Sequence, residues 1–225
     1  MTEYNALIID DHPLISEAYK SALLFVEKTD KTISFHIDVA HDCDTANDFI
    51  KSYTDKKDIK LDLVFLDISL PPSKDGKILS GEDLGLIINN KIPATKVIVS
   101  TTFNDNFRIH SILKNLNPDG FLIKNDIVPK ELITAIKEVL DEPPYYSKSV
   151  MKLIRKQFTS DLILDDVDRR ILYEISIGTK MKDIKNIPLS IHGIEKRKKI
   201  LKKILDVQNS DDKSLILVAK EKGFI

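Results

Sequence analysis

The first half of the chain alternates between short apolar runs and longer segments with helical spacing. Apolar runs predict strands near residues 4–10, 32–40, 61–67, 96–101 and 120–123. Between these runs, apolar residues recur every three or four positions, as on one face of a helix. Because strands and helices alternate, we expect a doubly wound parallel sheet of the α/β class, with helices on both faces.

Residues that favour helix starts mark several of the predicted helices. Pro13 stands at the start of a helix that reaches about Phe25. Asp42 or Asp44 can cap a second helix that runs to Tyr53. The remaining helices of this half are expected at residues 81–90, 104–116 and 129–140.

The alternating pattern ends after residue 140. Pro143-Pro144 cannot continue a helix and favours an extended spacer. We therefore expect a first domain over residues 1–140, a linker over 141–163 and a second domain over 164–225. The linker should contain a tether helix from Lys148 to about Phe158.

The second domain has helical periodicity throughout. Asp165 or Asp166 can cap a helix that ends at Gly178, and a short helix over residues 181–187 stops at Pro188. Ser190 then caps a longer helix that reaches about residue 205. Two short helices, a tight turn and a third helix predict a small all-α helix-turn-helix domain.

The third of these helices has an apolar face and a basic one. At about 100° per residue, Ile194, Leu201 and Leu205 fall on one side. The opposite side, with its flank, carries the candidate DNA contacts His192, Lys196, Arg197, Lys199 and Lys203.

The two halves differ in charge, although the whole chain has 34 basic and 35 acidic residues. Residues 1–147 hold 24 acidic and 16 basic residues, a net charge of −8. Residues 148–225 hold 11 acidic and 18 basic residues, a net charge of +7. Such a basic domain is typical of a nucleic-acid-binding module, although a solvated basic surface has the same balance.

Polar side chains close four of the five predicted strands. Asp10 and Asp11 end the first, Asp67 ends the third, Thr101 ends the fourth and Lys124 follows the fifth. Parallel strands would bring these groups to one edge of the sheet. Carboxylate oxygens can hold Mg²⁺, and a carboxylate can attack phosphorus when metal and cation neutralise the developing charge. The sequence therefore predicts a phosphoryl-accepting site that uses Mg²⁺.

In these residues, with Pro71 four positions after Asp67 and Gly120-Phe121 before Lys124, the chain resembles the receiver domain of two-component response regulators. The match covers most of residues 3–140. It implies a flavodoxin-like (βα)5 fold in which Asp67 accepts a phosphoryl group from a phosphohistidine of a sensor histidine kinase. It also implies that Thr101 and Phe121 occupy switch positions and turn inward on phosphorylation.

Two neighbouring features refine the expected site. We expect the backbone carbonyl of Ser69 to join Asp10, Asp11 and Asp67 as a metal ligand. Residues 72–80 enlarge the loop that follows the phosphoacceptor strand, compared with the short turn usual in receivers. This loop shapes kinase choice or covers the phosphate, or it is a neutral surface insertion.

Residues 164–225 resemble the LuxR/NarL-type DNA-binding domain, through the Gly178 turn, Leu189-Ser190 and the final residues 223–225. The resemblance implies double-stranded DNA as a partner. It also places a dimer contact on a last helix over about residues 211–222. There, Leu215, Val218 and Ala219 either face a second copy or complete the domain's own core.

Three residues depart from this second family pattern. Gly193 stands where Thr is usual, Glu195 where Lys is usual and Lys198 where an apolar residue is common. A carboxylate is repelled by phosphate but can accept a hydrogen bond from cytosine, so no particular base contact is expected at Glu195.

The sequence predicts a DNA-binding response regulator that is phosphorylated on Asp67, is not an enzyme and forms a homodimer when phosphorylated. One alternative is a phosphohydrolase with an aspartyl nucleophile, but such enzymes commonly carry a second Asp where this chain has Ser69. The other is a regulator whose output domain binds a protein, which Glu195 and Lys198 leave open.

The chain is expected to be cytoplasmic and to have no membrane partner. No apolar run approaches the roughly 18 residues of a membrane span, and the first residues lack the pattern of a signal peptide. The lone Cys43 fits a reducing compartment, and we interpret it as a small buried hydrophobic residue.

Overall fold

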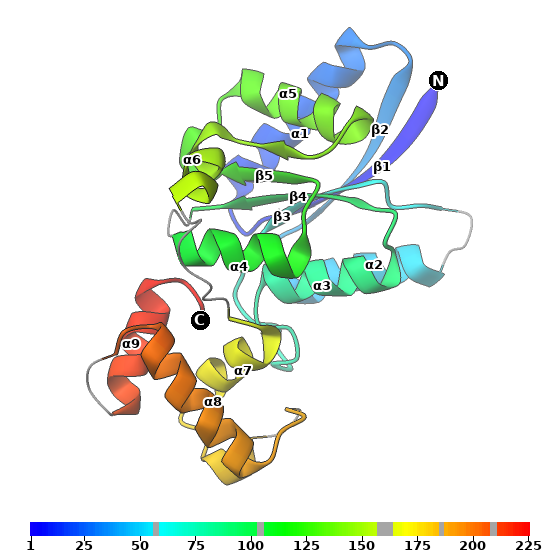
Figure 1. Cartoon of the computed structure of the whole chain (residues 1–225). Coiled ribbons are helices and arrows are strands. Elements are labelled where there is room, and N and C mark those ends of the chain that lie inside the picture. The colour runs from blue at the N-terminus through cyan, green and yellow to red at the C-terminus, as the bar shows by residue number, and fades with distance from the viewer. Residues whose placement is uncertain (56–58, 103–105, 157–163, 185–186, 208–210) are drawn as a thin grey trace.

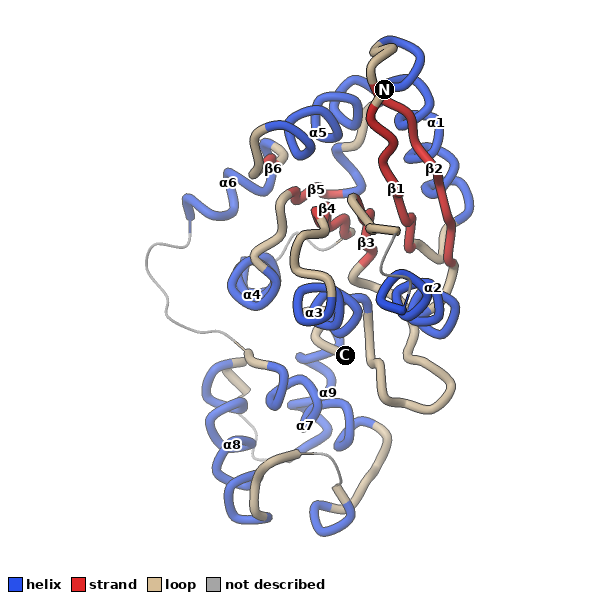
Figure 2. Tube along the Cα trace, turned by 90° about the vertical axis from the view of Figure 1, so that its right-hand side faces the viewer, coloured by secondary structure: helices blue, strands red, loops and turns tan. Residues whose placement is uncertain are grey.

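A computed structural model shows an α/β domain followed by a small helical domain (Figure 1). It describes residues 1–55, 59–102, 106–156, 164–184, 187–207 and 211–225. Figure 2 shows helices of the first domain lying between its sheet and the helical domain.

The α/β domain is built on one parallel sheet in the order β2-β1-β3-β4-β5-β6. Its strands are β1 (Thr2–Ile9), β2 (Ile33–Ala40), β3 (Leu63–Asp67), β4 (Lys96–Thr101), β5 (Gly120–Ile123) and β6 (Tyr145–Tyr146). The five predicted strands are confirmed. β3 is buried along its whole length, as expected for a central strand of a parallel sheet that is covered on both faces.

Helices cover both faces of the sheet, as predicted. They are α1 (Pro13–Thr29), α2 (Cys43–Asp55), α3 (Gly81–Lys91), α4 (Asn106–Leu116) and α5 (Pro129–Asp141). A short 3-10 helix, η1 (Lys124–Asp126), follows β5. One core lies under α1 and α5, and a second lies under α2, α3 and α4, which is the doubly wound arrangement.

The segment predicted as a linker adds structure to the α/β domain. Tyr145 and Tyr146 form β6, which pairs with β5, and α6 (Lys148–Lys156) packs against α4 and β5. Val150 of α6 is completely buried in the core under α4. The predicted end of this helix, Phe158, lies outside the described residues. The proline pair does stop α5, but the chain then returns to the sheet edge.

The helical domain contains α7 (Asp166–Ser176), the 3-10 turn η2 (Met181–Asp183), α8 (Ile191–Ile204) and α9 (Asp212–Glu221). Its core includes Leu172, Leu201 and Leu215, all completely buried. Gly178 ends the first helix with a φ of +80°, a value that favours glycine. The short helix predicted over 181–187 is a single 3-10 turn within the described residues, and residues 185–186 lie outside them.

Two further expectations concern apolar residues. Cys43 is only 1% exposed and lies in the core beneath α2, so its interpretation as a buried hydrophobic residue is confirmed. Among the described residues, no helix combines the length and apolar character that a membrane span requires.

Candidate functional site

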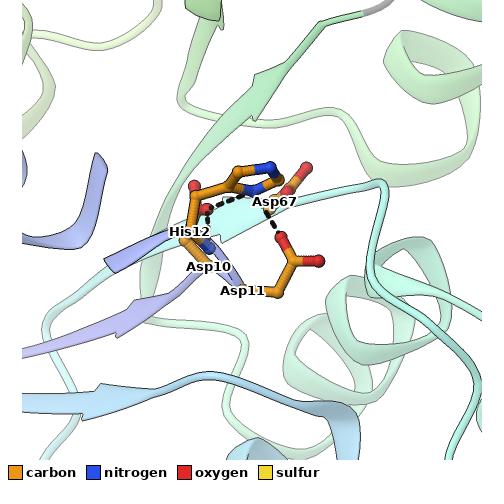
Figure 3. Close-up of side chains that lie close together, drawn as sticks. All are labelled: Asp10, Asp11, His12 and Asp67. Carbon is orange, nitrogen blue, oxygen red and sulfur yellow. Dashed lines mark hydrogen bonds and ion pairs between the residues drawn. The ribbon is translucent and has the colours of Figure 1, made fainter. Parts of the chain in front are cut away.

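The carboxyl ends of β1 and β3 bring four side chains together, as Figure 3 shows. One ligand atom from each of Asp10, Asp11, His12 and Asp67 lies within 4.8 Å of the others. Asp10 and Asp67 are 0% and 1% exposed, whereas Asp11 and His12 reach solvent. The predicted convergence of three carboxylates is confirmed. Carboxylate oxygens are the ligands that hard divalent cations prefer, so this acidic cluster suits a metal ion.

Lys124 lies between the two buried carboxylates. Its Nζ is 2.7 Å from Asp67 Oδ2 and 2.8 Å from Asp10 Oδ2, and the lysine side chain is 6% exposed. Burial lowers the pKa of Lys124, but hydrogen bonds and charge attraction from Asp10 and Asp67 outweigh burial, so this pKa is raised. The lysine is therefore a fixed cation that reaches the predicted phosphoacceptor.

Burial and hydrogen bonding shift the pKa of Asp67 in opposite directions. Burial raises the pKa of Asp67 above its usual range, although hydrogen bonds from Lys124 and from the Ser69 backbone N–H oppose the rise. The Ser69 N–H donates to Asp67 Oδ1 at 2.8 Å, and Lys124 donates to Oδ2. Both oxygens of the carboxylate are thereby held in a fixed orientation. The expected metal contact of the Ser69 carbonyl stays a prediction.

The start of α3 packs directly against the main chain at Asp67. A Cβ atom on Gly81 would lie 1.8 Å from the main-chain carbonyl oxygen of Asp67, so no larger residue fits there. Gly81 N–H donates to the Ile68 carbonyl, and Ser80 caps the helix by accepting from the Glu82 N–H. Sequence reasoning missed this close approach, although Ser-Gly before a predicted helix was the signal for it.

Thr101 and Phe121 are both placed within the domain interior. Thr101 ends β4 and is 0% exposed, and its register partner on β5 is Ile123. Phe121 is 0% exposed and packs in the core under α4. The positions agree with the predicted sequence pattern, and their roles as switch residues stay predictions.

The cations of α8 separate into paired and unpaired groups. Arg197 donates to Asp165 and Asp168, which form the capping box of α7. Lys198 and Lys202 both donate to Asp212 at the start of α9. These three side chains tie the domain together. Arg197 was expected among the DNA contacts; its guanidinium is paired with the α7 cap in this structure, and its contact with DNA stays a prediction.

The outer face of α8 carries the other four predicted contacts. His192, Lys196, Lys199 and Lys203 are all exposed. Within the described part of the chain, no ion pair engages them. Glu195 is exposed beside them. Within the described residues, the outer face of α8 therefore presents to solvent four basic side chains without ion-pair partners, together with one carboxylate.

The residues of α9 that were predicted as a dimer contact are mostly buried within the domain. Leu215 and Ala219 are completely buried in the domain's own core, which is the alternative that the sequence left open. Val218 packs partly against the same core. Leu217, between them, is 59% exposed and is the apolar residue of α9 that solvent reaches most.

No protein-family model matches the chain. Curated relatives include the oxygen regulatory protein NreC of Staphylococcus haemolyticus, which is 23% identical over 187 residues, 83% of this chain and 76% of that protein. NreC of Staphylococcus aureus strain USA300 is 22% identical over the same shares of both chains.

Similar solved structures include RcsB from Salmonella enterica serovar Typhimurium bound to promoter rprA in the presence of a phosphomimetic. It is 22% identical, with a TM-score of 0.68 over 97% of this chain and 99% of that one. RcsB bound to promoter P1flhDC is 22% identical, with a TM-score of 0.65 over 97% and 98%.

These likenesses span both domains. The chain is similar in sequence to NreC over most of its length, and its fold is similar to that of RcsB over nearly all of it.

Proposed function

We propose that the protein is a transcriptional regulator that binds double-stranded DNA and is controlled by phosphorylation of Asp67. The observation that carries this proposal is the buried side chain of Lys124, which joins Asp67 and Asp10 at the edge of the sheet. A sensor histidine kinase is the proposed phosphodonor. The chain would act as a homodimer when phosphorylated. The DNA-bound RcsB structures support this function by analogy.

The acidic cluster fits Mg²⁺ because its oxygens are hard ligands and its buried members are fixed. Asp10, Asp11, Asp67 and the Ser69 carbonyl would hold the ion. When bound, Mg²⁺ would neutralise charge on the phosphoryl oxygens.

The protein's own residues would carry the transfer. An oxygen of the Asp67 carboxylate attacks phosphorus, a P–O bond forms, and the P–N bond of the phosphohistidine breaks to release the imidazole. Lys124 exchanges its contact with Asp67 Oδ2 for a phosphoryl oxygen. The Thr101 hydroxyl, at the adjacent strand end, would bind another phosphoryl oxygen, and Phe121 would move with it.

The DNA contact would lie on the outer face of α8, with His192, Lys196, Lys199 and Lys203 as the contacting residues. These side chains are exposed, while the neighbouring Arg197, Lys198 and Lys202 have partners within the domain. An α-helix fits the major groove of DNA, and cations exposed along it can contact the phosphates that flank the groove.

The first test exposes the protein to Mg²⁺ and acetyl phosphate and measures intact mass. We expect one labile phosphate, absent in Asp67→Asn and much reduced in Asp10→Asn. Persistent labelling of Asp67→Asn would sink the assignment. The second test titrates labelled duplex DNA at several salt concentrations. Binding that weakens steeply with salt supports the DNA function, and its absence would favour a protein partner for the output domain.

A further inference from the structure

Helix α6 packs on the α/β domain, but its charge is like that of the helical domain. Its nine residues include four basic ones and no acidic one. Residues 1–147, which precede it, carry a net charge of −8. The change of sign along the chain therefore begins in an element that belongs structurally to the acidic domain.

The apolar side of α6 is fixed in the core of the α/β domain. Val150 is completely buried, and Leu153 and Ile154 pack against the same core. The Ser147 N–H, just before the helix, donates to the Phe121 carbonyl of β5 at 2.9 Å. An amphipathic helix that lies on a membrane needs its apolar face for the lipid, and here the protein's own core occupies that face. Only the opposite face of α6 is open to a partner.

This opposite face carries a row of cations. Lys148, Lys152 and Arg155 recur at i, i+4 and i+7, and all three are exposed. Within the described part of the chain, no ion pair engages their side chains. At 1.5 Å per residue the row extends over about 10 Å, a length in which one DNA strand presents about three phosphates. The spacing therefore suits a phosphate backbone.

A groove lies between α6 and the turn η1. Its volume is about 560 Å³, and Lys152 and Arg155 line it together with Asn125 and Asp126. Asp126 is the acidic residue of this lining. Among the described residues, no ion pair joins Asp126 to either cation. Both cations are therefore open to an anionic partner.

Buried ion pairs fix the place of the helical domain relative to α6. Arg169 of α7 lies 2.8 Å from Asp83 Oδ1 and 3.4 Å from Glu82 Oε1. Arg108 of α4 lies 2.6 Å from Glu82 Oε2, and both arginine side chains are 2% exposed. Helix α4 also packs against α6. The helical domain and α6 are therefore joined through the same helix.

In this arrangement the basic faces of α6 and α8 point to the same side of the molecule. Figure 2 shows both helices at its left-hand side, with α7 and α9 to the right of α8 and β5 to the right of α6. The outer face of α8 points away from α7 and α9, and the basic face of α6 points away from β5. A duplex held by α8 can therefore reach α6 as well.

We propose that α6 is a second DNA-contacting element, which binds the phosphate backbone through Lys148, Lys152 and Arg155. The inference rests on the proposed DNA binding by α8. Because cations that meet phosphates carry no sequence information, α6 would add affinity without preference for particular bases. Its cations would also offset the repulsion between DNA and the acidic domain.

The first test compares the full-length double variant Lys152→Ala/Arg155→Ala with Lys28→Ala/Lys137→Ala. The control removes the same charge from exposed sites on α1 and α5, which cover the other face of the sheet. Labelled duplexes of unrelated sequence are titrated between about 50 and 200 mM salt. Each phosphate contact contributes about −0.9 to the slope of log affinity against log salt, so the loss of two should flatten the slope by roughly two units. Over this range the wild type should lose roughly 10-fold more affinity than the α6 variant. The control should keep the wild-type slope.

The second test detects the contact itself by crosslinking. Met151, beside the row of cations, is 39% exposed, whereas the one native cysteine, Cys43, is 1% exposed. A thiol-reactive photocrosslinker should therefore attach selectively at Met151→Cys. The labelled protein should crosslink to duplex DNA, and the same label at Lys137→Cys on α5 should not.

Two results would overturn the role of α6. One is a Lys152→Ala/Arg155→Ala variant that keeps the wild-type slope, or changes it no more than the control does. An acidic protein as the partner of α6 would give this result. The other is a labelled Met151→Cys that crosslinks to DNA no more than Lys137→Cys. If the wild type itself binds no duplex, the proposed DNA function fails, which is a separate outcome.

Discussion

At the scale of single residues, the receiver site depends on one cation shared by two buried acids. Lys124 contacts Asp10 and Asp67 at once, at 2.8 and 2.7 Å. Without it, the two buried carboxylates would face each other without the lysine cation that joins them. A divalent metal can compensate the same charge. A bound metal ion should therefore restore part of the stability that is lost when the lysine is removed.

Lys124→Met should lower the free energy of unfolding by about 3 to 5 kcal/mol in the absence of Mg²⁺, because it leaves buried carboxylates unpaired. Added Mg²⁺ should recover much of this loss. Urea unfolding with and without Mg²⁺ measures both effects. Lys130→Met, an exposed lysine of α5, is the control and should change little. Equal Mg²⁺ stabilisation of wild type and Lys124→Met would contradict this account.

Cys43 offers a second prediction at this scale. Burial, with smaller contributions from Asp83, Asp42 and Asp44, raises the pKa of the Cys43 thiol to about 12. The reactive thiolate is therefore scarce at pH 8, and the side chain is 1% exposed. Iodoacetamide at pH 8 should leave the folded protein unmodified and label the chain in urea. Rapid labelling without denaturant would show that this core opens.

At the scale of elements, α8 uses its two sides differently. The cations that face α7 and α9 have acidic partners, and those on the outer face have none within the described residues. Each phosphate contact on B-DNA contributes about −0.9 to the slope of log affinity against log salt.

Lys203→Ala should therefore flatten the salt slope by about one unit and weaken all sequences alike. Lys196→Ala should instead cost roughly 1 to 3 kcal/mol on the cognate site only, because it lies nearer the start of α8. Lys202→Ala is the matched control, since Lys202 is paired with Asp212. Titration of labelled duplexes at several salt concentrations distinguishes the three. If Lys196→Ala and Lys203→Ala both match wild type, α8 is not the reading helix.

The last helix, α9, carries one exposed leucine, Leu217, and one buried leucine, Leu215. Leu217→Lys places a charge on a side chain that is already 59% exposed, so the domain should stay folded. If α9 forms the homodimer contact, this variant should weaken self-association of the phosphorylated protein in analytical ultracentrifugation. Leu215→Lys buries an unpaired charge in the core and should unfold the domain. If Leu217→Lys associates as the wild type does, the dimer contact lies on another surface.

At the scale of the whole molecule, the ionised Glu82 carboxylate makes domain docking dependent on pH. The pKa of Glu82 lies below its ordinary value of 4.5, because two arginines outweigh the effect of burial. A carboxylate whose pKa is lowered by docking contributes stability above its ordinary pKa, and this contribution is lost as the pH falls through the lowered value.

Docking should therefore be constant between pH 7.5 and 5.5 and weaken only below about pH 4.5. Small-angle scattering at pH 7.5, 5.5 and 4.0, with circular dichroism to verify that each domain remains folded, measures this change. Glu82→Gln should remove the pH dependence. If the two domains of the wild type separate between pH 7.5 and 5.5, a group other than Glu82 controls the pH dependence of docking.

The sequence by itself determined the receiver fold and the convergence of Asp10, Asp67 and Lys124. Strand periodicity is local, and parallel strands must end at a common edge, so the order of the elements fixes where these side chains meet. The basic outer face of α8 was also readable, because helical spacing assigns each residue to a side.

Only the tertiary structure decided which charged residues have partners. Periodicity places Arg197 at the edge of a basic face, but its pairing with the α7 cap depends on how two helices pack. Arg169 and Asp83 are 86 residues apart in sequence, and their contact depends on how two domains dock. The return of Tyr145 and Tyr146 to the sheet edge as β6 is equally non-local. Local pattern specifies the face that a side chain occupies, whereas packing between distant segments specifies what that face contacts.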